Sequence, residues 1–186
     1  MSKKLIDAIT LASTLHDGQI RKMETVPYIL HPMEVATIIG SMTDDEDVII
    51  AGLLHDAVED TNFEAQEIKE RFGNRVAELV ASETENKRKT LEPKSTWKIR
   101  KQESLEVLKN TTDRDIKILW LSDKLANMRV MYRSWCKLGE KMFDAFHQKN
   151  ISEQKWYYES VAEYTYELKD THAHKEYVEY MKKIFS

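Results

Sequence analysis

Residues 48–60 read VIIAGLLHDAVED, an apolar run that ends in a cluster of ionisable side chains. Its apolar positions cover most of the circumference of a helix that we expect over about residues 43–60, so this helix is expected to be buried. At about 100° per residue, the ionisable side chains fall within about 140° of one another. They are His55, Asp56, Glu59 and Asp60. Buried carboxylates and imidazoles need partners, and a bound cation is an efficient one.

Two further candidate ligands lie elsewhere in the chain. His31 directly precedes Pro32 at the expected start of a helix, and Asp123 interrupts the apolar stretch ILWLSDKL at residues 118–125. A site of two imidazoles and two carboxylates suits Mn²⁺, Fe²⁺ or Co²⁺, tolerates Zn²⁺ and lacks the thiolates of structural zinc sites. The candidate metal ligands are therefore His31, His55, Asp56 and Asp123. On the residues alone, a buried ion-pair network or helix-capping carboxylates explain the same pattern.

Composition favours helices. Hydrophobic residues make up 41% of the 186-residue chain, which is enough for a core, and 5 Gly and 3 Pro are too few for many short strands joined by turns. The single cysteine excludes an intrachain disulfide, and no apolar run is long enough to span a bilayer. The net charge of −4 argues against nucleic-acid binding as the main role. We expect a cytoplasmic protein with no nucleic-acid or membrane partner.

The apolar periodicity predicts an all-α chain. Asp17 and Gly18 are expected to end the first helix, and the segment 134–150 is ambiguous between irregular structure and a short helix. The expected helices cover about residues 3–16, 32–42, 43–60, 64–71, 74–85, 96–109, 114–133 and 152–184.

Five motifs occur in a fixed order: GQIRK at 18–22, PYILHP at 27–32, LLHDAVEDT at 53–61, FG at 72–73 and SDKLANMR at 122–129. The series resembles the HD-domain metal phosphohydrolases and, more narrowly, the hydrolase domain of RelA/SpoT homologues. Those enzymes use Mn²⁺ to remove the 3′-pyrophosphate of (p)ppGpp. The resemblance implies an HD-domain helical bundle, with residues 1–186 forming a single domain that ends in a C-terminal helix. It also implies a stand-alone small alarmone hydrolase, similar to the metazoan SpoT homologue.

The resemblance also implies roles for individual residues. Glu59 and Asp60 would activate the attacking water, and the four candidate ligands above would hold the metal. The expected nucleotide contacts are Arg21, Lys22, Asn127, Lys98, Arg100 and Lys101. For the last three, a solvated helix face is an equally good explanation of the basic stretch at 87–101.

Three departures from the family pattern leave the base preference open. Met23 follows the Arg-Lys pair in place of Ser or Thr, Val130 follows Asn-Met-Arg in place of Thr, and residues 82–86 replace a Gly-Val-Thr-Lys-Leu segment. One alternative is therefore a phosphatase for another nucleotide, such as an adenosine alarmone (pApp), NADPH or a nucleoside monophosphate. Another is a sensor that binds its nucleotide without cleaving it. The oligomeric state is not predicted.

Overall fold

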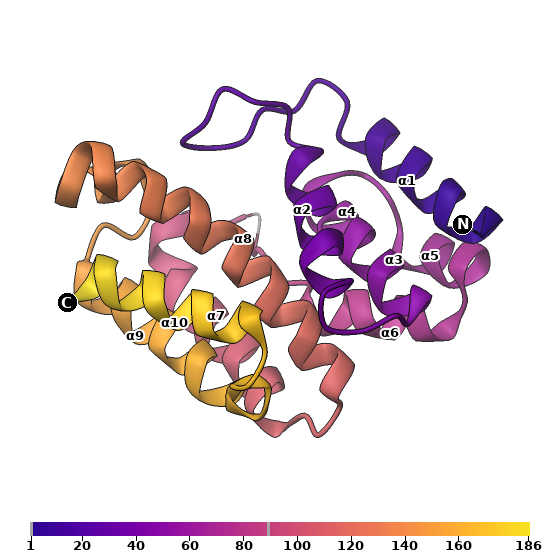
Figure 1. Cartoon of the computed structure of the whole chain (residues 1–186). Coiled ribbons are helices and arrows are strands. Elements are labelled where there is room, and N and C mark those ends of the chain that lie inside the picture. The colour runs from indigo at the N-terminus through magenta and orange to yellow at the C-terminus, as the bar shows by residue number, and fades with distance from the viewer. Residues whose placement is uncertain (1, 89) are drawn as a thin grey trace. The chain divides into compact units, whose positions relative to one another are not determined.

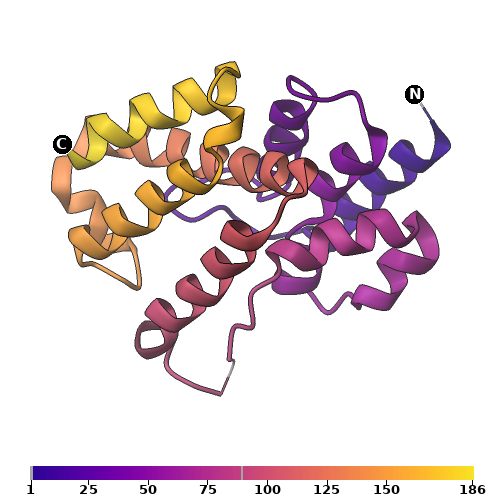
Figure 2. The same cartoon turned by 90° about the horizontal axis from the view of Figure 1, so that it is seen from below.

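The computed structural model describes residues 2–88 and 90–186 and confirms the all-α class. In this part of the chain the β-type backbone pairing is limited to one isolated bridge between Ile20 and Pro27. The chain folds as two compact units, of which the first ends at Thr84 and the second comprises Glu85–Ser186 (Figures 1 and 2). Among the described residues, no helix is both long and apolar enough to span a membrane. The single domain over residues 1–186 stays a prediction.

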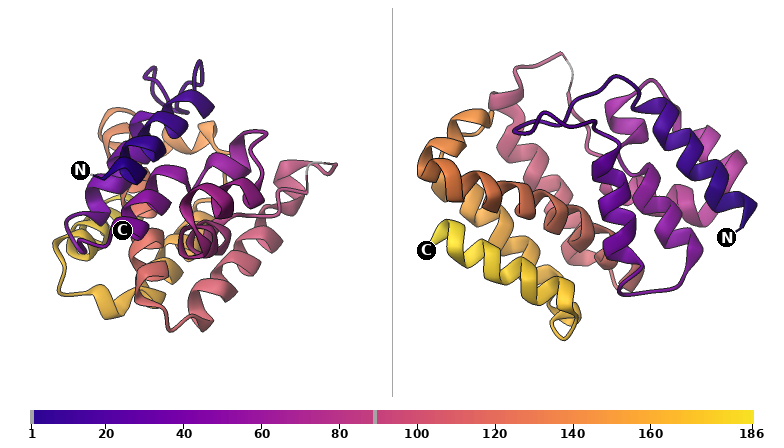
Figure 3. Two further views of the ribbon diagram at one scale, coloured as in Figure 1. Left: turned by 90° about the vertical axis from the view of Figure 1, so that its right-hand side faces the viewer. Right: turned by 45° about the horizontal axis from the view of Figure 1, so that its top comes forward.

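The first unit is built around its third helix. This helix, α3, packs against α1, α2 and α6, and α5 packs against α6. The apolar run of α3 is buried almost completely, including Val48, Ile50 and Leu54. The helices of this unit are α1 (Lys3–Leu15), α2 (Leu30–Ile39), α3 (Glu46–Leu54), α4 (Ala57–Asp60), α5 (Ala65–Phe72) and α6 (Asn74–Glu83). The right-hand view of Figure 3 shows the long loop that joins α1 to α2.

The prediction of one helix over residues 43–60 is wrong at both ends of α3. Asp45 caps α3 by accepting a hydrogen bond from the backbone N–H of Asp47, so the helix begins at Glu46. It ends at Leu54, and the chain resumes as the short helix α4 after His55 and Asp56. The Gly52 carbonyl, which the backbone N–H of Asp56 would bond in a continuous helix, bonds Nδ1 of His55. Two of the candidate ligands, His55 and Asp56, therefore lie at a break between two helices.

Gly52 allows α2 and α3 to approach closely. A β-carbon at this position would lie 2.4 Å from Cδ1 of Ile39 and 3.4 Å from the backbone of Ala36. Only glycine avoids this overlap without a shift of the Ile39 side chain. The close contact packs the second half of α2 against α3 within the first unit.

The second unit is built around α8, which packs against α7, α9 and α10. Its α-helices are α7 (Pro93–Asn110), α8 (Arg114–Leu138), α9 (Ile151–Tyr164) and α10 (His172–Phe185), with 3-10 helices η1 (Gly139–Ala145) and η2 (Tyr166–Leu168). Helix α8 extends five residues beyond the predicted end, and the ambiguous segment 134–150 contributes its last turn and η1.

The predicted C-terminal helix over 152–184 is wrong, because the chain folds back as an antiparallel pair (Figures 1 and 2). Thr165 ends α9 and its hydroxyl donates to the Val161 carbonyl at 2.7 Å. Thr171 starts α10 by accepting from the backbone N–H of His174. The buried hydroxyl of Tyr177 then donates to the Tyr158 carbonyl at 2.9 Å, which fastens the two helices together. Tertiary burial produces this turn without a glycine or proline.

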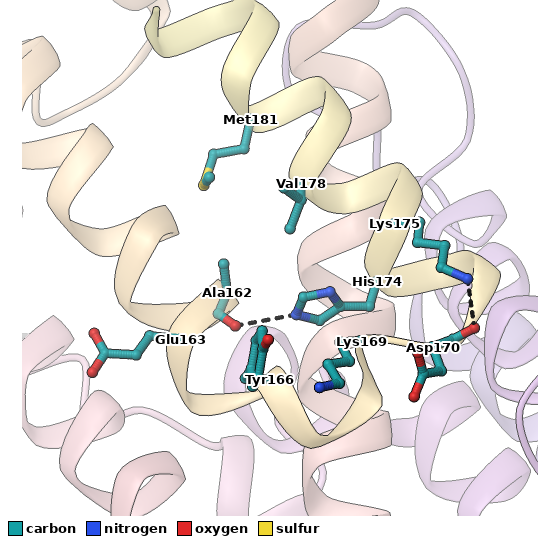
Figure 4. A pocket seen from close by; sticks show the side chains of 9 residues that line it. All are labelled: Ala162, Glu163, Tyr166, Lys169, Asp170, His174, Lys175, Val178 and Met181. Atoms are coloured by element: carbon teal, nitrogen blue, oxygen red, sulfur yellow. Dashed lines mark hydrogen bonds between the residues drawn. The ribbon is translucent and has the colours of Figure 1, made fainter.

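A pocket of about 510 Å³ lies where α9, η2 and α10 meet (Figure 4). His174 lies in its wall and is buried, and its Nε2 bonds the Ala162 carbonyl at 3.1 Å. His174 therefore belongs to the packed interior at the start of α10 and not to its solvated face. The lining residues carry two positive and two negative side chains, so the pocket favours neither an anion nor a cation. It is lined by Ala162, Glu163, Tyr166, Lys169, Asp170, His174, Lys175, Val178 and Met181.

A charge cluster at the start of the second unit gives a stability prediction. The Glu85 side chain is only 9% exposed and pairs with Arg100 at 2.7 Å and with Lys101. Burial raises the pKa of Glu85, but Lys101, Lys124 and Arg100 outweigh it and hold the pKa below its ordinary value. We expect Glu85→Gln to lower the free energy of unfolding by about 2–3 kcal/mol at pH 7, because two cations lose their buried partner. Urea denaturation followed by circular dichroism measures this change.

The difference in stability between the unchanged protein and Glu85→Gln should depend on pH in a definite direction. Because the folded state lowers the pKa of Glu85, its stabilisation is present above the unfolded pKa and is lost as the pH falls through the folded pKa. The difference between the two proteins should therefore shrink in acid. The control is Glu179→Gln, which removes an exposed partner of Lys183 and should lower the free energy of unfolding far less than Glu85→Gln does, because solvent screens the exposed pair. Equal losses from both variants would contradict this account of Glu85.

Candidate metal centre

The break between α3 and α4 fixes the orientation of His55. Its Nδ1 lies 2.9 Å from the Gly52 carbonyl oxygen, which can only accept a hydrogen bond. Nδ1 therefore carries the proton, and in the neutral ring Nε2 carries the lone pair. Nε2 lies 3.0 Å from Oδ2 of Asp56. A backbone carbonyl behind the ring is the arrangement that commonly orients metal-binding histidines.

His31 reaches the same carboxylate oxygen from the first turn of α2. Its Nε2 lies 3.4 Å from Oδ2 of Asp56, and its ring meets the His55 ring edge-to-face with 5.1 Å between centroids. Both imidazoles are buried. Two ring nitrogens thus converge on one carboxylate oxygen, and all three atoms belong to the first unit.

The electrostatics of this group suit a cation. Burial alone would raise the pKa of the Asp56 carboxyl, but His55 and His31 hold it well below its ordinary value, so the group is charged. A carboxylate oxygen that faces the lone pair of a neutral imidazole at 3.0 Å is repelled unless a proton or a metal ion lies between them. The two nitrogens and one oxygen therefore fit a divalent metal.

The sequence left two alternatives to a metal site, which are helix-capping carboxylates and a buried ion-pair network. Asp56 precedes α4, yet its side chain makes no capping hydrogen bond, so the helix-cap explanation is wrong for this residue. An ion pair between Asp56 and a protonated imidazole satisfies the same distances. The two explanations predict different results in a metal titration. A metal site takes up a divalent ion, whereas an ion pair between Asp56 and an imidazole does not.

Tyr28 belongs to this site, and the sequence reasoning missed it. Its hydroxyl donates to Oδ2 of Asp56 at 2.6 Å and lies 3.2 Å from Oδ2 of Asp60. Its position three residues before His31, in the motif PYILHP, is the signal that places it near the ligands.

The predicted catalytic pair lies on α4, one turn after the break. Glu59 is half-buried and Asp60 is exposed. The Asp60 backbone N–H bonds the Asp56 carbonyl at 2.9 Å, and the Gln19 amide donates to the Asp60 carbonyl at 3.3 Å. These contacts tie the pair to Asp56 and to the loop before α2.

Arg21 and Lys22, the predicted nucleotide contacts of the first unit, lie in that loop. Arg21 is buried, bonds the Val26 carbonyl through its backbone N–H and lies 3.4 Å from Glu24. Lys22 is exposed, and Met23 takes a positive φ of 65°. The two side chains therefore sit in different environments, and their role in binding stays a prediction.

Asp123 and Asn127 lie one turn apart on α8, in the second unit. Asp123 is buried, pairs with Lys124 and accepts a hydrogen bond from Nδ2 of Asn127 at 2.8 Å. The two side chains therefore share one face of α8. The role of Asp123 as a metal ligand stays a prediction.

The other predicted nucleotide contacts lie on α7 of the second unit, and each has an acidic partner. Lys98 pairs with Glu153 and lies over the Trp156 ring, 3.3 Å from its centroid. Arg100 and Lys101 share Glu85. Their role in phosphate binding stays a prediction, and Lys89 of the same basic stretch lies outside the described residues.

Comparisons with curated proteins identify related sequences. A family model described as HD domain matches residues 8–144. The chain is 38% identical over 125 residues to a guanosine-3′,5′-bis(diphosphate) 3′-pyrophosphohydrolase of Aquifex aeolicus, which covers 67% of this chain and 17% of that protein. It is 34% identical over 126 residues to a GTP pyrophosphokinase of Myxococcus xanthus, which covers 67% of this chain and 16% of that protein. The chain thus spans only a small part of these relatives.

Two solved structures share the fold. The structure of lmo0812 from Listeria monocytogenes is 34% identical with a TM-score of 0.72, and the match covers 86% of this chain and 96% of that one. A metazoan ortholog of SpoT, described as hydrolysing ppGpp, is 24% identical with a TM-score of 0.76 over 98% of this chain and 96% of its own. Because the family match covers most of the chain and includes the motifs around His31, His55 and Asp123, this chain belongs to the HD domain family.

Proposed function

We propose that this protein hydrolyses the 3′-diphosphate of (p)ppGpp and releases pyrophosphate together with GDP or GTP. The observation that carries the proposal is the convergence of His31 and His55 on one oxygen of Asp56, one turn before Glu59 and Asp60. Relatives that are 33–38% identical and are named for this reaction support it. The substrate is a small molecule.

We propose Mn²⁺ as the metal, with Fe²⁺, Co²⁺ and Zn²⁺ as substitutes, held by His31, His55, Asp56 and Asp123. Two nitrogen and two carboxylate ligands leave positions for oxygen ligands from water and substrate. When bound, the ion supplies Lewis acidity that polarises a phosphoryl oxygen and lowers the pKa of a coordinated water. The Gly52 carbonyl keeps the lone pair of His55 directed toward the Asp56 carboxylate.

Glu59 and Asp60 orient the attacking water and take its proton. The water oxygen bonds to the phosphorus attached to the ribose 3′-oxygen, and the bond from that phosphorus to the 3′-oxygen breaks. The acidic pair returns the proton to the ribose oxygen, which leaves a 3′-hydroxyl and free pyrophosphate. Arg21, Lys22 and Asn127 contact the nucleoside, and Lys98, Arg100 and Lys101 bind its phosphates.

Product analysis tests the proposed reaction. We expect the purified, Mn²⁺-loaded protein to convert ppGpp into GDP and pyrophosphate in equimolar amounts, as measured by anion-exchange chromatography. Release of orthophosphate instead would contradict pyrophosphate release. Parallel assays with pApp, NADPH and a nucleoside monophosphate test the alternatives that Met23 and Val130 leave open. Tight binding of ppGpp with no product in any assay would identify a sensor and contradict the proposal.

A further inference from the structure

The hydroxyl of Tyr28 lies between two carboxylates that have different proposed roles. It donates to Oδ2 of Asp56 at 2.6 Å, and Oδ2 of Asp60 lies 3.2 Å from the same oxygen. Asp56 is a proposed metal ligand, and Asp60 belongs to the proposed water-activating pair. One neutral side chain therefore contacts both parts of the site and supplies the hydrogen that separates two negative groups.

The Tyr28 ring is itself held in place. It packs against His16 with 4.9 Å between ring centroids and meets His31 edge-to-face at 5.8 Å. His16 ends α1, is buried and bonds Oε1 of Gln19 through Nδ1 at 2.9 Å. The Tyr28 backbone N–H bonds the Gln19 carbonyl at 2.9 Å. Because the ring has contacts on two sides, the hydroxyl has little freedom to leave the carboxylates.

Helix α4 needs such support because it has only four residues. A single helical turn fixes several backbone dihedrals for very few hydrogen bonds and is not stable by itself. Two side chains of the loop before α2 reach its last residue, since Gln19 bonds the Asp60 carbonyl and Tyr28 contacts the Asp60 carboxylate. The loop therefore constrains where Asp60, the last residue of α4, points.

We propose that Tyr28 is a positioning residue that orients Asp56 for metal binding and Asp60 for water activation through one hydroxyl group. The second half of this proposal rests on the proposed function. The first half concerns metal affinity alone and is measured without any substrate.

The test is Tyr28→Phe, which removes the hydroxyl oxygen and keeps the ring contacts with His16 and His31. We expect the dissociation constant for Mn²⁺, measured by calorimetry, to rise about tenfold, as for the loss of other groups that orient metal ligands. The kcat for ppGpp should fall about tenfold or more while KM changes less than twofold, because the hydroxyl acts through its contacts with the two carboxylates. The melting temperature verifies that the variant is folded.

The matched control is Tyr166→Phe. Tyr166 is 59% exposed, and it lies in η2 of the second unit, where it lines the pocket beside His174. It should leave the Mn²⁺ affinity and kcat unchanged. Tyr28→Phe with the Mn²⁺ affinity of the unchanged protein would overturn the metal half, and a raised KM with unchanged kcat would overturn the catalytic half. If the unchanged protein binds Mn²⁺ but cleaves no ppGpp, the proposed function fails, while the affinity comparison still decides the role of Tyr28 toward the metal.

Discussion

His55→Ala is expected to abolish both Mn²⁺ binding and ppGpp hydrolysis. The substitution removes the Nε2 lone pair of His55, one of the two imidazole nitrogens that converge on Oδ2 of Asp56. Loss of a group that only orients a ligand costs about 10–100-fold in metal affinity, so loss of the ligand itself should cost at least about 100-fold. Metal content after dialysis, measured by mass spectrometry, and a calorimetric titration with Mn²⁺ give the size of the loss. Asp56→Ala should behave in the same way.

His147→Ala is the matched control for this experiment. His147 is an exposed histidine of the second unit that follows η1, so its loss should change neither the metal content nor the turnover. Circular dichroism establishes that each variant is folded. A His55→Ala protein that retains one equivalent of Mn²⁺ after dialysis would show that His55 is not a ligand. In that case the distances to Asp56 would describe an ion pair between the two side chains.

Periodicity predicted most helices of the first unit, because their apolar positions determine which face is buried. It could not predict the break after Leu54. The helical pattern continues through Ala57 and Val58, so the sequence favours an unbroken helix. At the break, Nδ1 of the His55 side chain bonds the Gly52 carbonyl, which is the acceptor that the Asp56 backbone N–H would use in a continuous helix. A competition between a side chain and the backbone for one carbonyl leaves no trace in the spacing of apolar residues.

The turn between α9 and α10 is a second feature that the periodicity of the sequence could not predict. Residues 165–171 contain no glycine or proline, and the flanking segments are both amphipathic enough for one long helix. The chain turns because a pair of helices can bury Tyr158 and Tyr177 against each other and against α8, which one extended helix cannot do. Local propensity is a weak predictor where tertiary burial favours a different local structure.

The candidate ligands could be chosen from the sequence because buried ionisable residues are rare and costly, so each one stands out in an apolar stretch. Tyr28 could not be chosen in this way. A tyrosine in a loop is unremarkable by composition, and its value here depends on contacts with Asp56 and Asp60, which lie 28 and 32 residues further along the chain. The spacing of Tyr28 to His31 indicates that it lies near the ligands, but it does not indicate the contacts with Asp56 and Asp60.

Substitution of the acidic pair should separate chemistry from metal binding. We expect Glu59→Gln and Asp60→Asn each to lower kcat by about 10²–10⁴-fold, the range typical for loss of a general base. The Mn²⁺ affinity should change by less than about threefold, since both residues lie outside the proposed ligand set while Asp56 keeps its contacts with His31 and His55. Steady-state kinetics with ppGpp and a Mn²⁺ titration of each variant measure the two quantities separately.

The control for this pair is Glu78→Gln, which changes an exposed glutamate on α6 in the same way and should leave kcat unaffected. The double variant adds a further test, because two residues that handle the same proton act as a unit. Its loss of kcat should therefore fall well short of the product of the two single losses. Full activity of Glu59→Gln would exclude Glu59 from proton transfer. Multiplicative losses would instead assign the two carboxylates to separate steps, with Asp60 placed by Tyr28 and Glu59 acting independently of it.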